Sequence, residues 1–182
     1  MSRPLLIASA LSALAACGPA SEAMPAKPPK PEVPAPGPAV FLVTPSAVGP
    51  ATVTTPFDRN TIQRMFRGSD VSAEFRHADG VESRVIVVRG PGDLKIEFGG
   101  VEKEILGAFI TGSTVRGLRD EKIGDRFSSL GFARNQCVSG IGRLSGALAC
   151  HRPGDQLLGF VFAPASAADP ALREFYWRAG AP

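Results

Sequence analysis

Three cysteines are the residues of this sequence whose side chains most readily take part in covalent chemistry. Cys17 stands near the amino terminus, directly after two alanines, whereas Cys137 and Cys150 lie close together in the carboxyl-terminal half. A thiol can be alkylated, can bind a metal ion, or can pair with a second thiol in a disulfide. The surroundings of each cysteine indicate which of these reactions it undergoes.

The residues before Cys17 predict lipidation. Arg3, the apolar stretch 5–16 and the small residues at its end have the order of a secretory signal. The stretch is shorter than the roughly 20 residues that a membrane-spanning helix needs. Leu14-Ala15-Ala16-Cys17 resembles a bacterial lipobox, in which the cysteine receives a diacylglyceryl group and the signal is cut before it. We therefore expect a signal peptide over 1–16 and a lipid on Cys17.

Residues 17–50 are predicted to form a flexible tether behind that lipid. Ten of the seventeen prolines lie between Gly18 and Pro50, and few large apolar side chains separate them. Such a segment cannot bury enough apolar surface to offset the entropy of ordering; a ligand for a proline-binding module is the alternative reading. Gly18, rather than aspartate, after the lipidated cysteine favours the outer membrane of a Gram-negative bacterium, with a globular domain over 51–182 in the periplasm.

Cys137 and Cys150 then remain as a pair. An exported domain meets oxidising conditions, where two cysteines usually form a bridge. The bridge would close a loop of about 14 residues, which stabilises the fold by roughly 3 kcal/mol in the chain-entropy model. We expect this disulfide.

Composition and motif spacing argue against several other functions. The formal net charge is only +3, and the basic residues do not interleave with aromatic residues in any run, so no nucleic-acid partner is expected. The glycines of SGIGRLSG (139–146) come close to a dinucleotide fingerprint but lack a strand–helix context, and we expect no cofactor. His77, His151 and the two paired cysteines match no zinc spacing, and we expect no metal.

No catalytic residue is predicted. Ser128, Ser139 and Ser145 could be grouped with His151 and Asp155 as a triad, but no G-x-S-x-G elbow surrounds any of them. Two pairs of carboxylates are close in sequence, and we expect both pairs to be solvated charges at strand edges or turns. They are Glu102 with Glu104, on one strand, and Asp120 with Glu121.

The pattern after residue 40 predicts a β-rich α+β domain. A short amphipathic helix is expected over 56–66, with Thr55 as its N-cap. Alternating apolar residues then predict an antiparallel meander of four strands, with a hairpin at Asp79-Gly80 and a turn at Gly99-Gly100.

The second half of the chain repeats this order faintly. It predicts a second short helix over about 124–131, strands over 137–140, 143–150 and 156–164, and a turn at 152–155. Tyr176 and Trp177 are expected to cover an edge of the core. This similarity in the order of elements raises the hypothesis of two related halves around one core.

Taken in order, these features resemble the uncharacterised YfeY-like lipoproteins of Gram-negative bacteria. The features are the lipobox, the polar spacer, VGP before a helix, the β meander, IGDRF, C-x12-C, LLGFVF and a late tryptophan. The resemblance covers nearly all of 40–182. It implies an outer-membrane lipoprotein with a β-rich domain, and it carries over no catalytic residue.

We therefore expect a non-enzymatic, lipid-anchored envelope protein that binds another envelope component, either a protein or a cell-wall polymer. Two alternatives stay open. One is a hydrolase acting on envelope material, which would need polar residues gathered in a cleft. The other is an inhibitor of lytic enzymes, for which the turn at 152–155 is the candidate loop.

Overall fold

The computed structural model describes residues 40–78 and 80–180, so the predicted signal, the lipidation site Cys17 and most of the tether lie outside the described residues. The elements are β1 (Phe41–Thr44), β2 (Ala47–Val48), β3 (Ala51–Thr52), α1 (Arg59–Met65), β4 (Asp70–Ala78), β5 (Val81–Arg89), β6 (Lys95–Val101), β7 (Glu104–Thr111), β8 (Val115–Arg116), the 3-10 turn η1 (Arg134–Gln136), β9 (Cys137–Ser139), the 3-10 turn η2 (Gly142–Leu144), β10 (Leu148–His151), β11 (Leu158–Ala163) and β12 (Ala171–Arg178).

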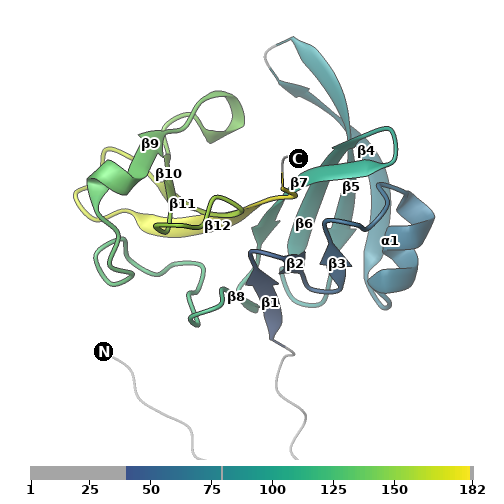
Figure 1. Cartoon of the computed structure of the whole chain (residues 1–182), viewed down its shortest axis with the longest axis horizontal. Coiled ribbons are helices and arrows are strands. Elements are labelled where there is room, and N and C mark those ends of the chain that lie inside the picture. The colour runs from purple at the N-terminus through teal and green to yellow at the C-terminus, as the bar shows by residue number, and fades with distance from the viewer. Residues whose placement is uncertain (1–39, 79, 181–182) are drawn as a thin grey trace, which may run out of the picture. The chain divides into compact units, whose positions relative to one another are not determined.

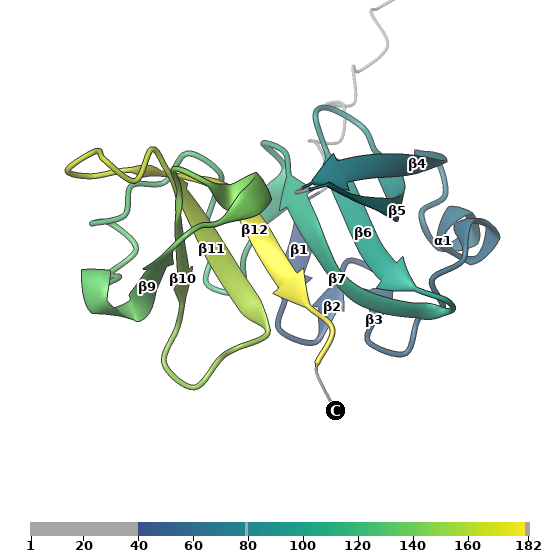
Figure 2. The ribbon, with the colours of Figure 1, turned by 90° about the horizontal axis from the view of Figure 1, so that it is seen from above.

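Eight of the strands form one antiparallel sheet in the order β4-β5-β6-β7-β12-β11-β10-β9. Each half of the chain contributes a four-stranded meander, and the last strands of the two meanders, β7 and β12, pair in the middle (Figure 2). A smaller sheet, in the order β3-β2-β1-β8, contains one parallel pair, β1 with β8. The predicted β-rich α+β class is confirmed.

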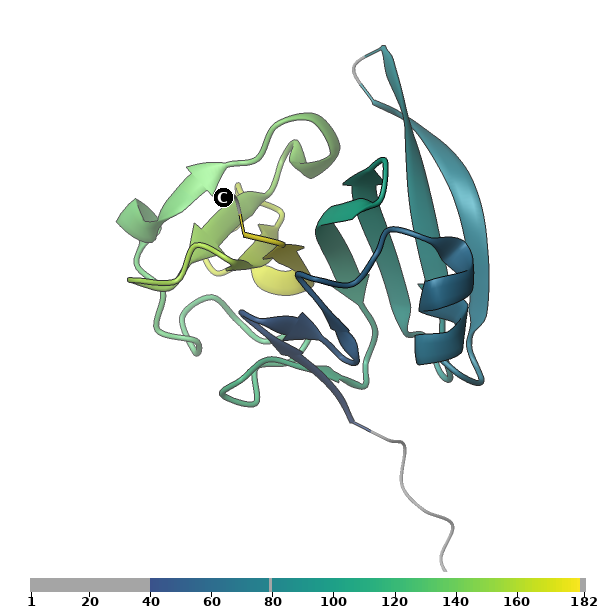
Figure 3. The same ribbon diagram turned by 45° about the vertical axis from the view of Figure 1, so that its right-hand side comes forward.

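The core lies against one face of the large sheet. Ile86, Phe98 and Ile110 of the first meander and Phe160 and Phe175 of the second are all buried there. The small sheet and α1 cover this face, and α1 lies beside the β4–β5 hairpin (Figures 1 and 3). Alternation with a period of two places the polar residues of the same strands on the opposite, outer face.

The hairpin between β4 and β5 is confirmed by the pairing of Ala78 with Val81, and the first helix is confirmed, although it starts later than predicted. Its N-cap is Asp58, whose Oδ1 accepts a hydrogen bond from the Thr61 amide at 2.8 Å. Pro56 and Phe57 instead bridge to the turn between β6 and β7, and the Phe57 amide donates to the Lys103 carbonyl at 2.8 Å. Among the described residues no helix is long and apolar enough to cross a membrane.

The predicted second helix is wrong, because 124–131 forms a series of turns. Its hydrogen bonds are divided between short local turns, such as the Ser129 amide to the Arg126 carbonyl at 3.0 Å, and the segment at the start of β12. The Gly124 amide donates to the Leu172 carbonyl at 2.7 Å, and the Phe127 amide donates to the Pro170 carbonyl at 2.9 Å. These two tertiary hydrogen bonds hold the first half of the segment out of a helix, and the second half forms turns only. The predicted strand 143–150 is also shortened, since 142–144 forms η2.

The predicted turn at Gly99-Gly100 is wrong as well. Strand β6 continues through both glycines to Val101, with a bulge between them, and the chain turns after Val101. Glu102 has a φ of 51° in this turn, so it does not share a strand with Glu104. A Cβ on Gly100 would lie 2.3 Å from the Glu104 carbonyl oxygen, so close packing of the bulge requires glycine there.

Two further expectations are corrected at the ends of the domain. Strands begin at Phe41, and Val43 and Val48 are fully buried, so the folded part starts about ten residues before the predicted boundary at 51. Trp177 does not cover an edge of the core. It is fully buried on the central strand β12, and its indole N–H donates to the Pro45 carbonyl at 2.9 Å.

Candidate binding site

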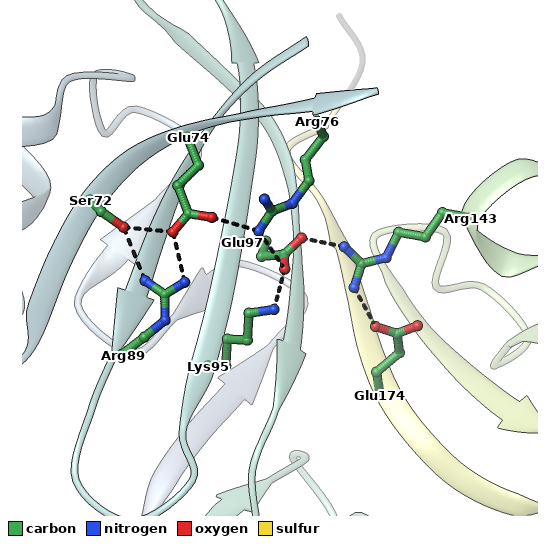
Figure 4. A network of polar contacts seen from close by, with 8 residues as sticks. All are labelled: Ser72, Glu74, Arg76, Arg89, Lys95, Glu97, Arg143 and Glu174. Atoms are coloured by element: carbon green, nitrogen blue, oxygen red, sulfur yellow. Dashed lines mark hydrogen bonds and ion pairs between the residues drawn. The ribbon is translucent and has the colours of Figure 1, made fainter. Parts of the chain in front are cut away.

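A row of charged side chains crosses the outer face of the large sheet (Figure 4). It begins on β4 and β5, passes over β6, and ends on β12, with one arginine reaching in from the turn η2. Its members are Ser72, Glu74, Arg76, Arg89, Lys95, Glu97, Arg143 and Glu174. The pairing of the strands determines this row, because residues directly opposite one another lie on the same face of the sheet.

Glu97 lies at the centre of the row and is almost fully buried. Its carboxylate contacts Lys95 Nζ at 2.5 Å, Arg76 Nη2 at 3.4 Å and Arg143 Nη1. Burial opposes the ionisation of Glu97. The hydrogen bond from Lys95 and the charge of Arg143 outweigh that effect and lower its pKa from 4.5 to about 2.

Glu74 is held in the same way at the β4 end of the row. Its Oε1 accepts from Arg89 Nη2 at 2.7 Å, and its Oε2 lies 2.8 Å from Arg76 Nη2. The hydrogen bonds from Arg89 and Ser72 lower the pKa of Glu74 to about 2. At neutral pH both Glu74 and Glu97 are therefore carboxylates that fix cations in place.

Arg143 joins the two halves of the sheet. Its Nη1 donates to Glu97 on β6, and its Nη2 donates to Glu174 Oε2 on β12 at 2.9 Å. The guanidinium carbon lies 4.0 Å from the centre of the Phe109 ring, which stacks on Tyr176 at 4.9 Å. A cation above an aromatic face in this geometry is attracted by the ring.

Arg143 has no role that its sequence context indicates, because it lies in SGIGRLSG, whose pattern is that of a glycine motif. The predicted disulfide between Cys137 and Cys150 is present, with a Cα–Cα distance of 4.1 Å. It closes the segment between β9 and β10 that carries Arg143. An arginine inside a disulfide-closed loop, together with acidic residues on strands, is the sequence signal that could have indicated these ion pairs.

A groove of about 410 Å³ lies beside this row on the same face. This volume is within the range of small-molecule sites. A Cβ on Gly99 would meet no atom within 4 Å, so this glycine leaves the floor of the groove open. The walls combine apolar side chains with the two arginines of the row that face the groove. They include Arg76, Val85, Val101, Leu106, Phe109, Arg143 and Tyr176.

The histidines considered as metal ligands lie far apart in the fold. His77 is on β4, at one edge of the large sheet, where its Nε2 lies 3.3 Å from Glu82 Oε1. His151 is on β10, near the other edge, and its ring packs against Gly159. Its Nδ1 is buried and has no hydrogen-bond partner within the described part of the chain.

The residues considered as a triad are not brought together either. Ser128 Oγ donates to Asp169 Oδ2 at 2.9 Å, and Asp155 Oδ1 accepts from the amides of Leu157 and Leu158 in the turn after β10. Asp169 and Asp155 therefore accept hydrogen bonds that stabilise loops.

Two further expectations are wrong, one for the solvation of Glu121 and one for the turn at 152–155. Glu121 was predicted to be a solvated charge, but it is buried, and its Oε1 accepts from Arg152 Nη2 at 2.8 Å. The guanidinium of Arg152 also lies over the rings of Phe132 and Phe160. The turn at 152–155 therefore directs its arginine into the protein and does not present it at a protruding tip.

Comparison with known proteins relates the chain by fold alone. No family model matches the sequence, and no curated protein matches it. Among solved structures, the chain is similar to the crystal structure of the uncharacterized protein yfeY from Escherichia coli. The two share 21% sequence identity with a TM-score of 0.61, over 75% of this chain and 98% of that chain. The protein thus has a YfeY-like fold.

Proposed function

We propose that this protein is a lipid-anchored, non-enzymatic binding protein of the bacterial envelope. Cys17 would carry the lipid, the proline-rich segment would act as the tether, and the domain would hold another envelope component, either a protein or a cell-wall polymer. The lipobox Leu14-Ala15-Ala16-Cys17 supports the anchor, and the likeness in fold to yfeY is consistent with the family that the sequence resembles.

The observation that supports binding is the groove on the outer face of the large sheet. It combines an open glycine floor at Gly99 with exposed apolar side chains, of which Val101 is 55% and Leu106 50% exposed. Large exposed apolar residues that gather beside a cavity are typical of a contact surface. The charged row along one side would fix the orientation of whatever binds.

The state of the carboxylates favours binding over acid–base catalysis. A general acid or base works best when its pKa lies near the ambient pH. Glu97, which lines the groove, and Glu74, which contacts Arg76 beside it, have pKa values of about 2, and both are engaged by arginines. They are suited to positioning cations. The inward orientation of Arg152 likewise gives no support to an inhibitory loop at 152–155.

Site-specific crosslinking in cells tests this proposal. A photoreactive amino acid at Val101 places the probe in the groove. The same amino acid at Val138 is the matched control, since that valine is also exposed but lies on β9, the edge strand of the other meander. We expect a discrete envelope component to be captured from Val101 and not from Val138. Capture of the same material from both positions, or from neither, would contradict the groove as the binding site.

A further inference from the structure

The charged row is layered, with its carboxylates beneath its cations. The side chains of Glu74, Glu97 and Glu174 are 24%, 7% and 4% exposed, whereas those of Arg76, Lys95 and Arg143 are 38%, 42% and 40% exposed. The negative charges are thus covered, and the positive charges reach the surface. The outer face of the sheet presents a cationic surface although its ion pairs include several carboxylates.

The arginines of this row keep unused hydrogen-bond donors. A guanidinium has five N–H groups in a planar fork that matches carboxylate and phosphate oxygens. Two nitrogens of Arg143 are engaged by Glu97 and Glu174, and Arg76 contacts both of its carboxylates through Nη2 alone. Because the buried carboxylates already fix these side chains, little rotamer entropy would be lost when they bind an anion.

A second cavity, of about 580 Å³, adjoins the groove and shares Arg76, Glu97 and Arg143 with it. Lys95 and Arg173 also line this cavity, so its lining holds four cationic side chains and one carboxylate. Glu74 and Glu174 pair with Arg76 and Arg143 from outside the lining, and Arg89 pairs with Glu74. With these three residues included, cations still outnumber carboxylates by five to three. Arg173 is exposed and forms no ion pair within the described residues. Charge complementarity here favours an oxyanion.

The groove on the other side of Arg76 and Arg143 has a different character. Val85, Leu106 and Tyr176 line it, and Gly99 leaves its floor open. An inorganic anion would leave this apolar part uncovered, and a neutral apolar molecule would leave the arginines without a partner. A molecule with an oxyanion at one end and an apolar body would satisfy both parts of the site.

We propose that the groove binds an anionic amphiphile. Its phosphate or carboxylate group would accept hydrogen bonds from Arg76 and Arg143, and its acyl chain would lie along Gly99 between Val85 and Leu106. This inference rests on the proposed function, since it assigns a ligand class to the same groove. Arg84 also lines the groove, but Arg76 and Arg143 lie on the side that it shares with the cationic cavity. This concentration of positive charge on one side favours such a ligand over a polymer whose charges recur along its length.

Calorimetric titration with dodecyl phosphate, below the concentration at which it forms micelles, tests the inference. The titration uses the full chain carrying Cys17→Ser, so that no protein-bound lipid competes for the groove. We expect saturable binding, and affinity for inorganic phosphate or dodecanol should be at least about tenfold weaker, since each lacks one half of the contacts. Laurate compares a carboxylate with a phosphate on the same chain, and binding of either amphiphile supports the inference.

Three variants locate the ligand. Arg143→Ala should weaken the binding of dodecyl phosphate by about tenfold or more, the loss expected for a hydrogen bond to a charged group. Gly99→Leu should abolish binding by filling the groove, because its added side chain enters open space and leaves the extended backbone unstrained. Arg173→Ala should weaken binding several-fold without removing any ion pair of the fold. Arg64→Ala on α1, remote from the groove, is the control and should bind normally.

Two results would overturn the inference. One is the absence of binding for both amphiphiles, and the other is binding that is unchanged in Arg143→Ala and in Gly99→Leu. If either occurs while the crosslink from Val101 persists, the groove binds a partner of another class, and the proposed function stands. Loss of that crosslink would instead contradict the proposed function itself. Circular dichroism of each variant shows that lost binding does not reflect unfolding.

Discussion

Glu97→Gln tests the charged row directly. The substitution keeps the shape of the side chain but removes the charge that Arg76, Lys95 and Arg143 share. In the wild-type protein the fold lowers the pKa of Glu97 from 4.5 to about 2. Since one pKa unit corresponds to 1.36 kcal/mol, ionised Glu97 contributes ~3 kcal/mol to the free energy of unfolding at neutral pH. We expect the variant to lose about this amount at pH 7.

The same reasoning gives the dependence on pH. The pKa of Glu97 is lower in the folded state than in the unfolded state, so its contribution is complete above about pH 5 and is lost as the pH falls toward 2. The difference in free energy of unfolding between wild type and Glu97→Gln should therefore be largest at pH 7. It should fall to roughly half by pH 3.

Urea denaturation at pH 7, 5, 4 and 3 measures this difference. Glu82→Gln is the control, because Glu82 is exposed and its one ion pair among the described residues is with His77, so its removal should change the free energy of unfolding little at any pH. A difference for Glu97→Gln that is the same at pH 7 and pH 3 would refute the reasoning. It would show that the cations do not hold Glu97 ionised in the folded state.

Three other predictions concern the anchor, the disulfide and the helix. Cys17→Ser should block processing or release the protein from membranes, as fractionation would show, and unchanged attachment would contradict lipidation. Replacing Cys137 and Cys150 together by alanine should lower the free energy of unfolding by about 3 kcal/mol in a denaturant titration, and an unchanged midpoint would argue against the bridge. Asp58→Ala should cost about 1 kcal/mol in the same assay, since the Thr61 amide loses its acceptor, and no loss would contradict its role as N-cap.

The parts of the fold that the sequence predicted correctly depend on local patterns. Alternating apolar residues predicted the first meander, and Asp79-Gly80 predicted its hairpin, because a period of two and a two-residue turn are properties of the segment itself. The disulfide followed from the number of cysteines and the expected compartment. In each case no distant partner was needed.

The errors arose where a distant partner determines the local conformation. The turns at 124–131 have the composition of a helix start, yet the amides of Gly124 and Phe127 bond to the carbonyls of Leu172 and Pro170. Gly99-Gly100 has the composition of a turn, yet the neighbouring strand β7 holds it as a bulge. Glu121 has the local sequence of a solvated charge, yet it is buried against Arg152, which is 31 residues away in the sequence.

The charged row depends on the same kind of long-range pairing. Arg143 meets Glu97 across 46 residues and Glu174 across 31, and neither separation has a sequence signal of its own. The disulfide, which sequence alone does predict, closes the segment that carries Arg143 and ties it to the paired strands β9 and β10. A bridge expected only to stabilise the domain thus also restricts where Arg143 can lie. Arg143 contacts both meanders. The part of the charged row that lies beside the groove therefore forms only when the two halves are joined in one sheet.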